Sequence, residues 1–77
     1  MENGEYRTKD IGESAALYCS GIKLLRLDSG NGFYWFVFDG NNAETIANSY
    51  WSGELTLKAK VYNDSLRTLK ERVFANK

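Results

Sequence analysis

The sequence contains no histidine, no proline and only one cysteine, and these absences exclude several kinds of chemistry. Without histidine, the chain lacks the commonest metal ligand and the commonest general base. A single cysteine, Cys19, can form neither an internal disulfide nor a thiolate zinc cluster, and we expect it to be a small buried side chain. The remaining bases are carboxylates and lysines on predicted surfaces. The sequence therefore predicts a protein that is not an enzyme, with no metal and no cofactor.

Long apolar segments are absent as well. No apolar run reaches the roughly 18 residues that a transmembrane helix needs, and the first ten residues lack the apolar stretch of a signal peptide. The composition is 43% hydrophobic and 26% charged, which is typical of a folded soluble protein. We therefore expect a cytoplasmic protein without membrane contact. Its 77 residues predict one domain over residues 6–75, after a frayed segment at residues 1–5.

The strongest local signal is the pair Asn31-Gly32 between two apolar runs. Both residues tolerate the positive φ angles of a type I′ turn, so the pair predicts a β-hairpin. The second run, residues 33–38, consists of six consecutive large apolar or aromatic side chains. Successive side chains of a strand point to opposite faces, so this run places apolar side chains on both faces of one strand. One face must be core, and the other requires an explanation.

The hairpin register assigns these side chains to two faces. A two-residue loop pairs Leu27 with Phe36 and Leu25 with Phe38, whereas a loop of odd length would mix the two sets. The predicted core face carries Leu25, Leu27, Tyr34, Phe36 and Phe38. The opposite face carries the candidate interaction residues Leu24, Arg26, Phe33, Trp35 and Val37.

A first helix is predicted between the N-terminal segment and the hairpin. Asp10 and Glu13 have capping-box spacing, so the helix begins near Ile11. Gly21 can take the left-handed conformation that ends a helix, and Gly12 indicates a close approach of another part of the chain. Apolar spacing predicts an inward face of Ile11, Ala15, Tyr18 and Ile22. Residues 6–8 are compatible with a short edge strand.

Two further helices follow the hairpin. The first begins after a predicted capping box of Asn41 and Glu44 and ends at Gly53, and its inward residues are Ala43, Ile46, Ala47, Tyr50 and Trp51. Residues 54–57 form either a short strand or an extended crossover. The last helix runs over residues 58–75 with a core stripe of Tyr62, Leu66, Leu69 and Val73. The predicted fold is α+β in the order β-α-β-β-α-(β)-α, with the helices mainly on one face of a small antiparallel sheet.

Charge is distributed unevenly although the formal net charge is zero. Residues 58–77 contain six basic and two acidic side chains, whereas residues 1–57 contain four basic and eight acidic ones. At 100° per residue, one sector of roughly 80° on the last helix carries a basic band with an aromatic end. Its members are Lys60, Asn63, Arg67, Lys70 and Phe74. The pairs Lys60–Asp64 and Arg67–Glu71 have the spacing of ion pairs within one helix.

Three hypotheses for function follow from these surfaces. The first is a non-enzymatic interaction module that associates with itself or another protein through the second face of the sheet. The second is single-stranded nucleic-acid binding by Trp35, Tyr34 and Arg26 together with the basic band Lys60, Arg67 and Lys70. The third is an inhibitor that docks on a host protein through the acidic body.

Five short segments in this order carry a family resemblance: Tyr6-Arg7-Thr8-Lys9-Asp10, Gly21-Ile22-Lys23-Leu24-Leu25, Phe36-Val37-Phe38, Tyr50-Trp51 and Leu66-Arg67-Thr68-Leu69-Lys70. Together they resemble a family of short bacterial and phage proteins that is classified only as a domain of unknown function. The resemblance covers nearly the whole chain from Tyr6 to Phe74. It implies a small stand-alone domain in a bacterial cell or a phage-infected host, and it transfers no catalytic residue.

Overall fold

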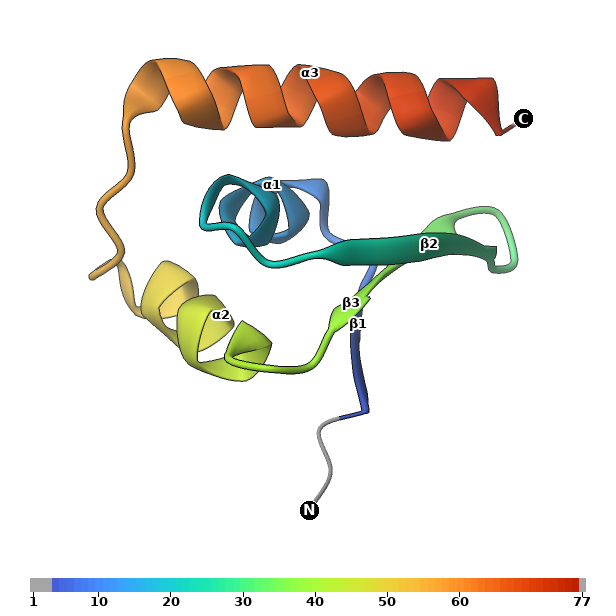
Figure 1. Cartoon of the computed structure of the whole chain (residues 1–77). Coiled ribbons are helices and arrows are strands. Elements are labelled where there is room, and N and C mark those ends of the chain that lie inside the picture. Colours follow the sequence, from blue (N-terminus) through green and yellow to red (C-terminus); the bar gives the residue numbers. More distant parts are fainter. Residues whose placement is uncertain (1–3, 77) are drawn as a thin grey trace.

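The computed structural model describes residues 4–76 and has the order β-α-β-β-α-α, which confirms the predicted α+β fold (Figure 1). The elements are β1 (Glu5–Thr8), α1 (Ile11–Cys19), β2 (Leu24–Ser29), β3 (Tyr34–Asp39), α2 (Ala43–Ser52) and α3 (Ala59–Ala75). Residues 54–58 connect α2 to α3 without a strand, so the extended crossover is the correct alternative. Of the segment expected to be frayed, residues 1–3 lie outside the described residues, and Glu5 already belongs to β1.

The sheet has the antiparallel order β1-β3-β2, so β3 is the central strand. The backbone amide of Gly30 donates to the carbonyl of Phe33 at 2.7 Å, which closes the hairpin around Asn31-Gly32. Leu27 lies opposite Phe36, as the two-residue loop predicts. The β1 strand completes the sheet by pairing with the other edge of β3, from Glu5–Asp39 to Thr8–Phe36.

A bulge in β2 changes the predicted faces beyond Arg26. The register runs from Arg26 opposite Val37 to Leu24 opposite Phe38, so Leu25 is the extra residue. An extra residue inverts the alternation of side chains along a strand. The prediction for these two leucines is therefore wrong. Leu24 packs against the core instead of joining the outer face, and Leu25 is exposed.

All three helices pack on the Phe36 and Phe38 face of the sheet, as predicted. The core joins these two rings to Leu17 of α1 and Leu69 of α3, all of them buried, and to two alanines of α2, Ala43 and Ala47. Figure 1 shows α1 beneath α3, with α2 to one side. No helix of residues 4–76 lies on the opposite face of the sheet, which we call the outer face.

The α1 helix has the predicted ends, and three of its four predicted inward residues, Ile11, Ala15 and Ile22, belong to the core or pack against it. Asp10 accepts a hydrogen bond from the backbone amide of Glu13 at 2.8 Å. The Ile22 amide donates to the Leu17 carbonyl at 3.0 Å, which completes the Schellman end after Gly21. Residues 13–17 are all buried, whereas Tyr18 is exposed, contrary to the prediction. A helix that packs against several elements buries more than one stripe of its surface, so the spacing of its apolar residues identifies only some of the buried positions.

Gly12 confirms the predicted close approach. The Tyr62 hydroxyl donates to the Gly12 carbonyl at 3.2 Å, and a Cβ at Gly12 would lie 2.6 Å from the Tyr50 hydroxyl oxygen. Two tyrosines from α2 and α3 therefore contact α1 at Gly12, where a side chain would displace the Tyr50 hydroxyl. Burial raises the pKa of Tyr62 above its usual value, and the neighbouring Tyr50 hydroxyl acts in the same direction.

The α2 helix departs from the prediction at its N-terminal end and at Trp51. Asn42, not Asn41, is the N-cap residue, with a left-handed φ of 65° and no side-chain cap, so the predicted capping box does not form. Gly53 ends the helix as predicted, also in the left-handed conformation. Trp51 is 61% exposed because α2 contacts the core only through its other side, so its prediction as an inward residue is wrong.

A buried carboxylate joins β1 to α1. Glu13 is only 4% exposed, and it accepts hydrogen bonds from the Tyr6 hydroxyl and, at 2.7 Å, from the Thr8 hydroxyl. Burial, followed by this contact with Glu13, raises the pKa of Tyr6 far above its usual value. Because a buried charge requires such donors, the three side chains fix the edge strand against the helix.

Glu13→Ala is expected to reduce the free energy of unfolding by about 2 to 3 kcal/mol, since it leaves the buried Thr8 hydroxyl and the half-buried Tyr6 hydroxyl without their acceptor. Glu44→Ala is the matched control, because Glu44 also lies in the first turn of a helix but is exposed. Its cost should stay below about 1 kcal/mol. Urea denaturation monitored by circular dichroism measures both values, and equal costs would contradict the role of Glu13.

Candidate interaction surface

The outer face of the sheet is built from alternate residues of the three strands. Arg7 of β1 and Arg26 of β2 both lie opposite Val37 of β3. Two residues away from Val37 on the same face of β3, Trp35 lies opposite Asp28. The central strand therefore presents apolar side chains, and the two edge strands present charged ones.

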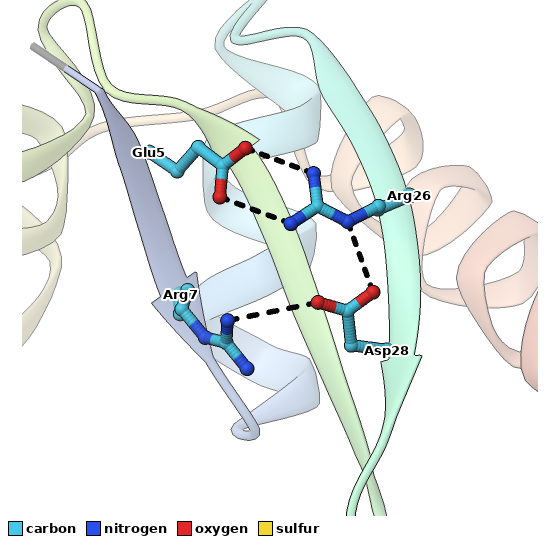
Figure 2. A network of polar contacts seen from close by, with 4 residues as sticks. All are labelled: Glu5, Arg7, Arg26 and Asp28. Carbon is cyan, nitrogen blue, oxygen red and sulfur yellow. Dashed lines mark hydrogen bonds and ion pairs between the residues drawn. The ribbon is translucent and has the colours of Figure 1, made fainter.

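A charged network crosses the outer face from β1 to β2 (Figure 2). The Arg26 guanidinium donates to both Glu5 oxygens at 2.9 and 3.0 Å and, through Nε, to Asp28 at 2.9 Å. The second Asp28 oxygen lies 3.6 Å from Arg7. We call Glu5, Arg7, Arg26 and Asp28 the charged network. It joins the two edge strands, which do not pair with each other.

The charged network covers Val37. This side chain has no exposed surface, although no helix lies on its side of the sheet. Its register partners are Arg7 and Arg26, and Figure 2 shows their side chains reaching over β3 toward carboxylates on the opposite edge strand, so we infer that the stems of these two side chains supply the cover. Long charged side chains can bury apolar surface under their stems while their charged ends stay in water. Val37, a predicted interaction residue, is therefore inaccessible in the single chain.

Phe33 and Trp35 form an aromatic pair at the hairpin end of the outer face. Their rings meet edge to face, with centroids 5.4 Å apart. The Arg7 guanidinium lies 5.3 Å from the centroid of the Trp35 ring, and the Lys9 ammonium lies 4.8 Å from that of Phe33. Both aromatic residues are half-buried. A Cβ at Gly30 would lie 2.4 Å from the Phe33 ring, so this glycine allows the ring to lie across the hairpin.

The nucleic-acid hypothesis needs residues that the structure separates. Arg26 already donates to two carboxylates, which would compete with phosphate. Tyr34 lies on the helix side, where its hydroxyl donates to the Asn76 carbonyl at 2.8 Å after the end of α3. The basic band also belongs to α3, whose Leu69 packs in the core behind the sheet. Trp35 and the basic band therefore lie on different sides of the molecule.

Within the basic band, Asp64 is the shared acidic partner. Lys60 contacts it at 3.0 Å, as predicted, and Arg67 lies 3.9 Å from it. The expected pair of Arg67 with Glu71 does not form among the described residues. The Arg67 side chain instead points to Asp64, one turn earlier in the helix. Part of the positive charge is therefore balanced within α3.

Other candidate chemistry is weak in the described part of the chain. Cys19 is half-buried and free. Residues 4–76 contain no group of three side chains that could hold a metal ion. Over the same residues, no helix is both long and apolar enough to cross a membrane.

The ion pair lowers the pKa of Glu5. Its hydrogen bonds to Arg26 are the largest cause, and they exceed the opposing effect of burial. The same contacts, first with Glu5 and then with Asp28, raise the pKa of Arg26 above its usual value. All four side chains of the charged network remain partly exposed, so salt is expected to weaken these interactions.

Comparisons with protein-family models, with curated proteins and with solved structures give no match. The resemblance to the bacterial and phage family therefore stays a prediction.

The sequence contains a signal for the charged network. Glu5 and Arg7 are two residues apart in β1, as are Arg26 and Asp28 in β2, and each pair combines opposite charges. Residues at this spacing share a face of a strand. The signal becomes specific only once both strands are known to flank β3.

The Glu5–Arg26 pair is expected to make stability depend on pH. Because the folded state lowers the pKa of Glu5 below its usual 4.5, the pair stabilises the fold above that pH and loses its effect as pH falls below it. The stability difference between the native protein and Glu5→Gln should therefore be larger at pH 7 than at pH 3. Urea titrations at both values test this. Arg26→Gln should reduce the pH dependence in the same way, and an unchanged difference would contradict the pairing.

Proposed function

We propose that this protein is a non-enzymatic interaction module that self-associates through the outer face of its sheet. The observation that supports this most directly is the aromatic pair of Phe33 and Trp35 on a sheet face that no helix covers. Aromatic side chains of this kind dominate the energy of protein contacts when a partner removes them from water. The residues available for the contact are Phe33 and Trp35 with Arg7 and Lys9, in place of Leu24 and Val37.

The charge pattern of the outer face fits a second copy. Along the charged network the signs alternate, in the order Glu5, Arg26, Asp28 and Arg7. A two-fold symmetric contact requires a surface that is complementary to itself, and a patch that carries both carboxylates and guanidinium groups allows such a contact, whereas a patch of one sign does not. The same balance gives little attraction for a strongly charged partner such as nucleic acid.

The size of the outer face limits the affinity. Three strands about 4.8 Å apart and six residues of about 3.3 Å each make a face of about 14 by 20 Å. This is smaller than the contact of about 800 Å² per partner in a standard protein interface. We therefore expect a weak dimer with a dissociation constant in the micromolar range.

Sedimentation equilibrium across about 10 μM to 1 mM should show a reversible monomer–dimer equilibrium. Trp35→Thr should weaken the dimer at least about tenfold, because it removes the larger ring of the aromatic pair. Trp51→Ala is the matched control: it removes the other, more exposed tryptophan, which lies on α2, and should leave the dimer unchanged. A monomer throughout this range, or equal effects of the two variants, would contradict the proposal.

A further inference from the structure

The α3 helix, which lies on the covered face of the sheet, carries a second surface. A shallow groove of about 560 Å³ runs beside the helix. Its lining residues span three turns of α3: Asn63, Leu66, Arg67, Lys70, Glu71 and Phe74. We call this surface the α3 groove. Its volume lies within the range of about 300 to 1,000 Å³ that is typical of binding sites.

The floor of the α3 groove is apolar. Phe74 is 76% exposed, the highest value among the large apolar side chains of the described residues. Leu66 packs partly against the core and also lines the groove. An exposed aromatic ring beside a leucine is typical of a contact surface rather than of a solvated helix face.

Two cations lie between these apolar side chains along the helix. Lys70 has no ion-pair partner among the described residues, and Arg67 has only the distant contact of 3.9 Å with Asp64. Positions 67, 70 and 74 recur at intervals of three and four, so the cations and Phe74 share one side of α3. The groove therefore combines an apolar anchor with positive charge that is weakly compensated.

We infer that the α3 groove binds an acidic amphipathic helix of another protein. A second helix can pack alongside the three exposed turns of α3 and place an apolar side chain between Leu66 and Phe74. Carboxylates on the flank of that helix would pair with Arg67 and Lys70. The chemistry of the partner follows from this combination of an apolar stripe with negative charge beside it.

Two other occupants fit the groove less well. A nucleic acid would pair its phosphates with the cations but would gain little from the apolar floor. The α3 helix of a second copy, placed antiparallel about the middle of the groove, would bring Arg67 and Lys70 against the same cations of its partner. Like charges at the centre of a contact oppose association.

This inference is independent of self-association. The helices lie on the covered face of the sheet, so a dimer formed through the outer face leaves the α3 grooves of both copies accessible. Such a dimer would present two equivalent helix-binding sites. A partner with two acidic helices would then bind more tightly than one with a single helix, provided that both sites can be reached together.

The probe is a synthetic alanine-based helix of about 18 residues, long enough to be helical in water, with a leucine stripe at helical spacing and glutamates beside it. Binding is measured by isothermal titration calorimetry with the full chain. The control peptide has every glutamate replaced by glutamine. The protein variants are Phe74→Ala and Lys70→Gln, and the matched control is Arg72→Gln, an exposed cation roughly opposite Lys70 on the helix.

The expected result is micromolar binding that Phe74→Ala and Lys70→Gln each weaken at least about fivefold, whereas Arg72→Gln changes it less than about twofold. The glutamine peptide should bind more weakly than the glutamate peptide. No binding at about 1 mM peptide, or equal effects of Lys70→Gln and Arg72→Gln, would overturn the inference. Tighter binding of a mixed oligonucleotide would overturn the class of partner. Sedimentation of Phe74→Ala separates this outcome from a failure of self-association, because its dimer should be unchanged.

Discussion

The structure depends on covering both faces of β3. Phe36 and Phe38 lie under the three helices, while Val37, between them, faces the side without helices. An apolar strand at the centre of so small a sheet would otherwise expose a large patch to water. Arg7 and Arg26 cover Val37, and Glu5 and Asp28 hold these arginines in place. The hydrophobic core thus covers one face of β3, and charged side chains cover the other.

This arrangement determines which surfaces remain for partners. The charged network leaves only the aromatic pair of Phe33 and Trp35 partly exposed, at the hairpin end of the outer face. The self-association that we propose there would therefore bury a small surface. The α3 groove lies behind the sheet and combines Phe74 with Lys70 and Arg67. Because the two surfaces are separate, substitutions in one are expected to leave the other unchanged, and each can be studied without disturbing the core.

The sequence predicted several features that depend on local geometry, although the capping box of Asn41 and Glu44 does not form. Asn31-Gly32 set the hairpin, Asp10 and Gly21 set the ends of α1, and Leu69 marked the buried stripe of α3. Features that depend on packing between elements were missed. No local pattern indicated the bulge at Leu25, and that one extra residue moved Leu24 into the core. Trp51 matched an inward helical position, but α2 is too peripheral to bury it. The cover of Val37 comes from side chains of β1 and β2, which are distant in the sequence: Glu5 and Arg26, which pair with each other, are 21 residues apart.

The cover of the outer face is tested most directly by the accessibility of Trp35. Trp51→Phe leaves Trp35 as the single indole, and Trp35→Phe leaves the exposed Trp51. Acrylamide quenching of both variants at low micromolar concentration, where a weak dimer dissociates, compares the two positions. The account predicts that Trp35 is quenched several times less efficiently than Trp51, because Arg7 and Phe33 lie against its ring. Equal quenching of the two tryptophans would show that the outer face is open and would contradict the account.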